Sequence, residues 1–138
     1  MFDLIRTFSK MFWCFEYKKA KIIIDVWIEN GDETAVLNLH GLKIEKLPKL
    51  PVNLQKLYCS GCPIKELPEL PESLQQLYCF NCPNLKELPK LPESLQVLDC
   101  YHCNIKKLPE LPIKLQDLYC YKCPIELLPT ILPAKVYL

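Results

Sequence analysis

The stretch Leu54-Gln55-Lys56-Leu57-Tyr58-Cys59 decides the fold of this chain, because it returns three more times in closely similar form. The later copies begin at Leu74, Leu95 and Leu115, so the steps are 20, 21 and 20 residues. A weaker copy begins at Thr34 and has Leu where the others have Cys. Self-similarity at a period of about 20 residues is typical of a solenoid. The sequence divides into five units, at about 34–53, 54–73, 74–94, 95–114 and 115–135.

Each unit has two halves with different physical signatures. The first half, such as residues 56–60, alternates apolar and exposed positions, which is the pattern of a half-buried strand. The second half reads Leu-Pro-x-Leu-Pro, as in residues 67–71. Two prolines three residues apart exclude a regular helix and favour an extended return. Neither half can bury its leucines alone, so stacked copies with parallel strands about 4.8 Å apart are predicted.

The combined pattern LxxLxCxxCxIxxLPxLPxx resembles the short leucine-rich repeat, whose consensus is LxxLxLxxN/CxL. It is similar to the Leu-Pro-x class of bacterial effectors and to Cys-rich repeats of large DNA viruses and amoebae. The resemblance implies an α/β repeat fold: a leucine-rich-repeat solenoid with a concave parallel β-sheet, extended LPxLP returns on the convex side and an N-terminal capping helix. It specifies the fold more strongly than the function, because a solenoid is a scaffold.

Residues 1–33 are predicted to form an N-terminal cap ahead of the repeats at 34–138. Five apolar residues lie at three- and four-residue intervals and predict a helix over about 2–19: Phe2, Ile5, Phe8, Phe12 and Phe15. We expect this helix to cover the first repeat, with Cys14 buried beneath it. Anchoring on a membrane surface and docking onto a partner are the alternatives.

Residues 21–29 read as a strand with Ile22, Ile24, Val26 and Ile28 on one face. We expect this strand to pair antiparallel with the first repeat strand and so to protect that edge of the sheet. At the other end, residues 136–138 start a sixth strand. The edge beyond it is predicted to be bare, which would suit an oligomer or a larger assembly.

Eight of the nine cysteines form CxxC pairs, one in each of four units: Cys59/Cys62, Cys79/Cys82, Cys100/Cys103 and Cys120/Cys123. Paired CxxC motifs are typical of zinc sites. The repeat offers a competing interpretation, since both positions point inward and the first unit has Leu39 and Leu42 there. The sequence therefore favours two ladders of buried thiols, with zinc and disulfides as the alternatives. An odd cysteine count and an N-terminus without signal-peptide order favour an intracellular, reducing location: the cytoplasm, or a virus particle assembled there.

The outward strand positions are expected to line the concave face. Eight of them form the candidate partner-binding surface: Tyr58, Tyr78, Phe80, Asp99, Tyr101, Asp117, Tyr119 and Tyr121. Tyrosine is enriched at binding hot spots, although aromatic residues also stack between neighbouring strands. The net charge of +1 and the few Lys and Arg beside the rings argue against nucleic acid.

Catalysis has little support in the sequence. His40 and His102 lie three repeats apart, and no Gly-rich phosphate loop occurs. We therefore predict no catalytic residues and no cofactor. The predicted function is a non-enzymatic protein–protein interaction scaffold that binds through its concave face. The alternative is a structural assembly component, such as a minor protein of a virus particle, that docks through the N-terminal helix and the C-terminal edge.

Overall fold

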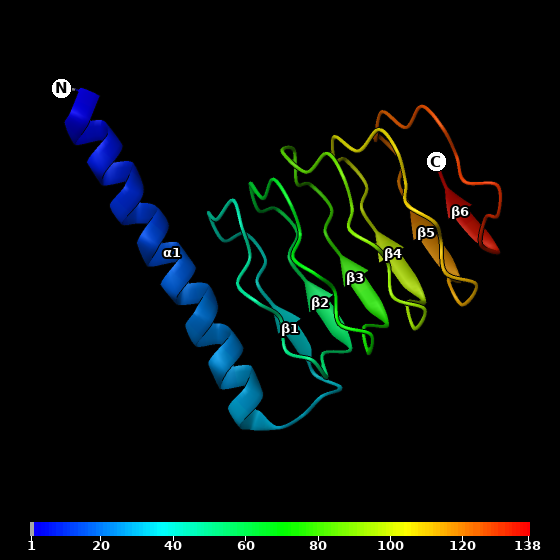
Figure 1. Cartoon of the computed structure of the whole chain (residues 1–138), viewed down its shortest axis with the longest axis horizontal. Helices are drawn as coiled ribbons and strands as arrows, with labels where there is room; N and C mark the ends of the chain where they lie inside the picture. Colours follow the sequence, from blue (N-terminus) through cyan, green and yellow to red (C-terminus); the bar gives the residue numbers. More distant parts are fainter. Residues whose placement is uncertain (1) are drawn as a thin grey trace.

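A computed structural model describes the backbone of residues 2–138 and the side chains of residues 9–138. It contains one helix followed by six short strands: α1 (Phe2–Asn30), β1 (Val36–Asn38), β2 (Lys56–Tyr58), β3 (Gln76–Tyr78), β4 (Val97–Asp99), β5 (Asp117–Tyr119) and β6 (Lys135–Tyr137). The strands form one parallel sheet in sequence order, as Figure 1 shows. The chain is thus a parallel β-solenoid of about five turns with a leucine-rich-repeat type fold, as the repeat pattern predicts.

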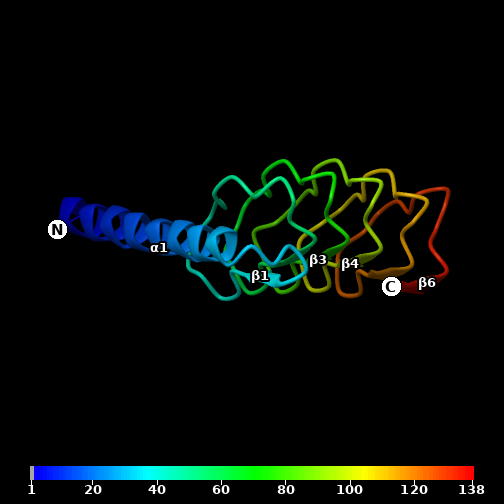
Figure 2. The same ribbon diagram turned by 90° about the horizontal axis from the view of Figure 1, so that it is seen from below.

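Each repeat contributes only three residues to the sheet before its turn, so every strand is short. The register pairs identical repeat positions, so that Leu57 lies beside Leu77, and Leu77 beside Leu98. These leucines are fully buried, and the leucines of the returns complete the core. Backbone bonds continue from rung to rung beyond each strand, and the Cys59 N–H donates to the Tyr78 carbonyl at 2.9 Å. The edge-on view in Figure 2 shows the stacked turns of the chain.

One turn position after each strand has a left-handed backbone. Gly41 and Gly61 hold it in the first two repeats, with φ of 71° and 69°. Asn81, His102 and Lys122 take the same position later, with φ of 55°, 55° and 57°. A non-glycine residue costs roughly 1 kcal/mol in this region. His102 is held there by Asn81 of the preceding rung, whose Oδ1 lies 2.8 Å from His102 Nδ1.

The predicted strand at residues 21–29 is wrong, because α1 continues without interruption to Asn30. A strand would place Ile22, Ile24, Val26 and Ile28 on one face, but only Ile24 of these four is buried. The antiparallel pairing expected with the first repeat is also wrong, since β1 pairs in parallel with β2 at the edge of the sheet. Packing explains the difference: residues 20, 24 and 27, spaced as one helical face, contact the first repeat.

The helix caps the first repeat with a different face from the one predicted. Ala20, Ile24 and Trp27 are buried, and the Trp27 indole N–H donates to the Ala35 carbonyl at 3.1 Å. Glu16 is also buried and accepts a hydrogen bond from the Lys43 N–H at 3.0 Å.

Only two of the five apolar residues expected to make this contact have described side chains, and neither of these two makes it. Phe12 and Phe15 are exposed, whereas the side chains of Phe2, Ile5 and Phe8 lie outside the described residues. Cys14, expected to be buried, is exposed. Figure 2 shows the N-terminal half of α1 extending beyond the repeats. No helix among the described residues is long and apolar enough to cross a membrane.

Candidate functional site

The outward side chains of the sheet form parallel columns on the concave face, because every strand repeats the same register. The middle column is Asn38, Tyr58, Tyr78, Asp99, Tyr119 and Tyr137. The next column, just beyond the strands, is His40, Ser60, Phe80, Tyr101 and Tyr121. The eight predicted surface residues therefore belong to one face, and all eight are half-buried by their neighbours. The six aromatic residues among them lie in these two columns.

The aromatic rings pack against each other along these columns. Phe80, Tyr101 and Tyr121 form a stacked ladder, with ring centroids 4.8 and 4.6 Å apart and interplanar angles of 10° and 5°. Tyr119 stacks on Tyr137 at 4.5 Å. Tyr137 belongs to the face although the sequence analysis did not assign it there. The sequence pattern that could have assigned it is the apolar–exposed alternation of residues 135–137, which pairs Tyr137 with Tyr119 in the sheet.

Ser60 and Asp99 each interrupt one aromatic column. Ser60 stands where later repeats have an aromatic ring; it is fully buried, and its Oγ has no hydrogen-bond partner among the described residues. Tyr58 makes an edge-on contact with Phe80 at 5.6 Å and a tilted one with Tyr78 at 5.3 Å, so it joins the two columns. Asp99 separates Tyr78 from Tyr119, and burial raises the pKa of its carboxyl group.

The acidic residues of the face differ in their partners. Asp117 forms an ion pair with Lys135, with Oδ1 and Nζ 3.4 Å apart. Asp99 accepts only a long hydrogen bond from the Tyr101 N–H, at 3.4 Å, and has no ion-pair partner among the described residues. Asp99 is therefore the carboxylate on this face that is available to a positively charged group.

The eight CxxC cysteines lie inside the solenoid, as the repeat register predicts. All nine cysteines are free thiols, and those of the repeats are buried apart from the half-exposed Cys123. The second cysteine of each pair hydrogen-bonds to a carbonyl of the preceding rung: Cys62 to Leu39, Cys82 to Cys59, Cys103 to Cys79 and Cys123 to Cys100, at 3.2, 3.5, 3.1 and 3.0 Å. The thiols thus satisfy backbone acceptors that the turn would otherwise leave unpaired.

The repeat thiols of Cys62 and Cys120 lie in surroundings that favour their neutral, protonated form, as expected of packed core residues. Burial raises the pKa of Cys62 to about 11 and the pKa of Cys120 to about 11. Cys123, at the C-terminal rung, is different, because a hydrogen bond with the Cys100 thiol lowers its pKa to about 7. Across the described residues, no group of three or more His, Cys, Asp or Glu side chains is arranged to hold a metal ion. The CxxC spacing is accounted for by the repeat geometry.

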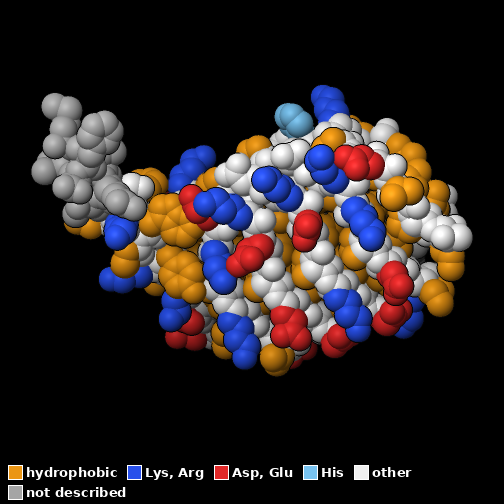
Figure 3. Space-filling model, turned by 45° about the horizontal axis from the view of Figure 1, so that its top comes forward, with side chains coloured by type: hydrophobic (Ala, Val, Ile, Leu, Met, Phe, Trp, Pro, Cys, Tyr) orange, Lys and Arg blue, Asp and Glu red, His pale blue; other side chains and the backbone are white. Residues whose placement is uncertain are grey.

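The outer side of the repeats is charged. Exposed ion pairs join neighbouring returns, with Lys46 3.0 Å from Glu66 and Lys106 3.2 Å from Glu126. Figure 3 shows Lys, Asp and Glu side chains mixed over this part of the surface. Such exposed pairs contribute little to stability, about 0–1 kcal/mol each. Their effect is to give this side a mixed, solvated surface with no excess of either charge.

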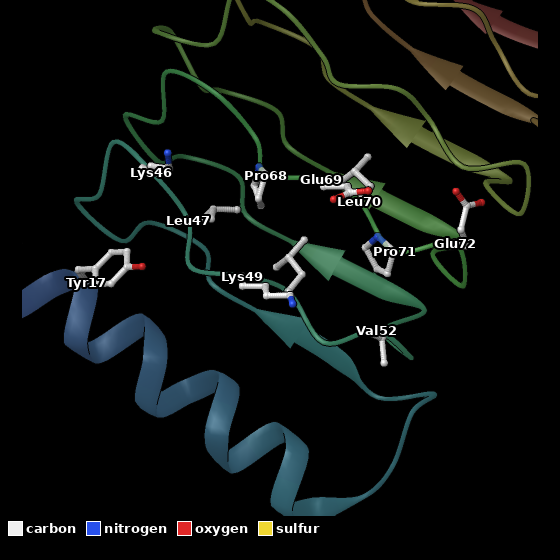
Figure 4. Close-up of a pocket in the computed structure, with 11 residues that line it drawn as sticks. Tyr17, Lys46, Leu47, Lys49, Val52, Pro68, Glu69, Leu70, Pro71 and Glu72 are labelled. Carbon is white, nitrogen blue, oxygen red and sulfur yellow. The ribbon is translucent and has the colours of Figure 1, made fainter.

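A groove that the sequence did not reveal lies between α1 and the first two returns. It encloses about 650 Å³ and has an apolar floor that includes Leu47, Leu50 and Leu70. Figure 4 shows Tyr17 facing this groove from α1, with Lys49 and Glu69 among the charged side chains around it. The two returns supply most of the lining of this groove, and α1 adds Tyr17 at one side.

The two histidines have structural neighbours. His102 bonds to Asn81, and the His40 ring packs 5.7 Å from Tyr58 and against Gly61. Among the described side chains, neither imidazole forms a hydrogen bond with a thiol or hydroxyl group, which is the contact that general-base catalysis uses.

Comparison with known proteins agrees with this architecture. The family model Leucine Rich Repeat matches residues 53–77, which span β2, its turn and its return as far as β3. No curated protein matches the chain. The matched segment and the five registered strand pairs define a leucine-rich-repeat scaffold. Scaffolds of this type typically bind other proteins and are typically non-catalytic.

Proposed function

We propose that the chain is a non-enzymatic scaffold that binds a partner protein against its concave face. The observation that carries this proposal is the stacking of aromatic rings on the outward side of the sheet: the ladder of Phe80, Tyr101 and Tyr121, and the pair Tyr119–Tyr137. A tyrosine offers a large apolar area with a polar tip. Because the stacked rings are already held by their neighbours, less side-chain entropy is lost when a partner covers them.

The chemistry of the face supports a partner with both apolar and basic groups. Asp99 lies between Tyr78 and Tyr119 in the middle column. An Arg or Lys side chain of a partner can pair with this carboxylate while its stem packs on the flanking rings. Lys56 and Lys135 are the cations in the first column of the face, which is too few to follow a nucleic-acid backbone. The free thiols support a reducing compartment as the place of binding.

The test compares two triple variants of the full chain. Tyr78/Tyr101/Tyr119→Ser removes rings from three successive strands of the concave face. Glu69/Lys90/Glu110→Ser changes the matched exposed residue of three successive returns. We expect a partner captured from native lysate by the wild type to be retained by the return variant and lost by the concave variant, with both variants folded by circular dichroism.

A second readout identifies the surface directly. A photocrosslinking amino acid at position 101 is expected to label the captured partner, and the same group at position 110 is not. Equal capture by both triple variants, together with crosslinks only from position 110, would overturn the proposal and place binding on the returns.

The second candidate function is a structural assembly component, and exposed apolar side chains at both ends of the array favour it. Phe12 and Phe15 are exposed on α1, and Leu127 and Ile131 are exposed at the C-terminal end. This candidate predicts that Phe12→Ser and Ile131→Ser prevent incorporation into a larger particle, whereas the concave triple variant is incorporated normally. Sedimentation of native lysates distinguishes the two outcomes.

A further inference from the structure

Helix α1 has a second apolar face that does not contact the repeats. Met11, Phe15, Ile22 and Val26 are 64, 65, 62 and 49% exposed. Their spacings of four, seven and four residues place them in one stripe along the helix. At about 100° per residue, this stripe lies roughly 140° around the axis from the face that packs on the first repeat. The outer stripe thus faces away from the solenoid.

Charged residues border the outer stripe in a definite order. Lys18 lies on one flank, and Asp25 and Glu29 lie on the same flank further along the helix. Lys18 and Asp25 are both exposed and are separated by seven residues, which is about two helical turns. None of these three residues takes part in the ion pairs found among the described side chains.

This charge order selects a second copy of α1 in the antiparallel direction. A two-fold axis between residues 21 and 22 places Lys18 of each copy beside Asp25 of the other, so two ion pairs form across the interface. The same arrangement packs Ile22 at the centre, with Phe15 and Val26 on either side. In a parallel pair, by contrast, the flanks that carry Lys18 and Asp25 lie on opposite sides of the interface, so Lys18 of one copy cannot pair with Asp25 of the other.

We propose that α1 pairs antiparallel with α1 of a second copy and forms a two-fold symmetric dimer. The interface is self-complementary, as a two-fold dimer requires. Because the outer stripe faces away from the repeats, the two solenoids lie on opposite sides of the helix pair and both concave faces stay open. A dimer of this kind presents two binding faces, which raises avidity for a multivalent partner. The pairing itself does not depend on the proposed concave-face function.

A charge-exchange experiment on the full chain tests the proposal. In sedimentation equilibrium, Lys18→Glu alone and Asp25→Lys alone are each expected to weaken dimerisation about tenfold, because each creates two like-charge contacts. An equimolar mixture of these two variants is expected to dimerise within about twofold of the wild type, because every cross-chain contact is then between opposite charges. The exposed return residue Lys90 provides the control, and Lys90→Glu is expected to leave dimerisation unchanged.

Two results would overturn the proposal. One is a wild type that stays monomeric at millimolar concentration. The other is dimerisation that neither Lys18→Glu nor Asp25→Lys weakens, or that both weaken and their mixture fails to restore. Phe15→Glu on the exposed stripe gives a further readout. If it abolishes binding to vesicles of phosphatidylcholine and phosphatidylserine while the wild type is monomeric in solution, the outer stripe binds membranes instead. Circular dichroism on each variant reports whether the fold is kept.

Discussion

The two ends of the solenoid contain the same repeat positions but bury them to very different extents. Leu67, in an inner return, is 7% exposed, whereas the matching Leu128 of the last return is 43% exposed. Leu70 is 5% exposed, and its counterpart Ile131 is 70% exposed. The residue types are alike, but the last return is shorter, since β6 begins 18 residues after β5 whereas β5 begins 20 residues after β4. The rung that follows also differs. Each leucine is buried by the next repeat, and the last repeat has only the short β6 beyond it.

At the N-terminal end, α1 covers the apolar side chains of the first repeat. Leu47 and Leu50 of the first return stay 2 and 5% exposed, with Ala20, Ile24 and Trp27 of the helix in the same buried cluster. In a solenoid, stability is approximately a sum of repeat terms and nearest-neighbour interfaces. A helix of unrelated sequence can therefore cover the edge of a repeat in place of a neighbouring repeat, provided that one of its faces is apolar.

The largest expected effect comes from removing the main anchor of this helix. Trp27→Ala deletes a buried indole and its bond to the Ala35 carbonyl, and we expect the free energy of unfolding to fall by about 3–5 kcal/mol. Urea denaturation followed by circular dichroism measures this. The matched control is Ile28→Ala, which changes an exposed residue on the same helix and is expected to alter stability by about 0.5 kcal/mol or less. Equal effects of the two variants would mean that α1 does not act as the cap.

The next largest effect is the difference in stability loss between the same substitution in an inner return and in the last return. We expect Leu67→Ala to lower the free energy of unfolding by about 2–5 kcal/mol, because it leaves a cavity between covered rungs. Leu128→Ala removes the same atoms from a half-exposed side chain and is expected to cost about 1 kcal/mol. Urea titrations of the two variants beside the wild type measure both losses of unfolding free energy. Similar costs would show that the C-terminal end is covered in solution, for example by another chain.

The smallest effect concerns pH and the thiols near the two ends. Cys62 lies near the capped end and Cys120 near the open end, and burial raises the pKa of each to about 11. An unfolded chain has thiols with pKa about 8.5, so it releases these protons first as pH rises. The stability that the buried thiols contribute is complete below about pH 8.5 and is lost as pH rises toward 11.

Between pH 8 and 9.5 we expect the free energy of unfolding to fall by at most about 1 kcal/mol for each such thiol. Cys62→Ala and Cys120→Ala are each expected to reduce the slope of unfolding free energy against pH. Urea titrations at several pH values supply that slope. If only Cys62→Ala changes it, the rung at the open end is already exposing its thiol to solvent before global unfolding.

Most of the solenoid could be predicted from the sequence because the pattern is local and repeated. The alternation in residues 56–60 and the prolines of residues 67–71 recur in register, so the strands, the returns and the inward cysteines follow from one unit. The same register placed the tyrosines of the concave face. It did not predict that Ser60 would be fully buried or that Tyr58 would contact Phe80, because those contacts depend on side chains from two different columns.

The non-repeated N-terminus shows where sequence reasoning failed. The run Ile22-Ile23-Ile24 favours a strand, but the intrinsic preference amounts to under about 1 kcal/mol per residue. Full burial of one large apolar side chain contributes about 1.5–3 kcal/mol, and the helical form buries both Ile24 and Trp27 against the first repeat. Tertiary packing therefore outweighs the local preference.

The repeat sequence alone predicts the period, the strand register, the extended returns and the two thiol ladders, since each depends on residues within a single repeat and is multiplied by stacking. Packing in three dimensions sets how far α1 extends, which of its faces is buried, where the groove beside the returns lies and which apolar side chains remain exposed at the two ends. The physical reason is that those features depend on interfaces between unlike elements, for which no repetition in the chain supplies a template.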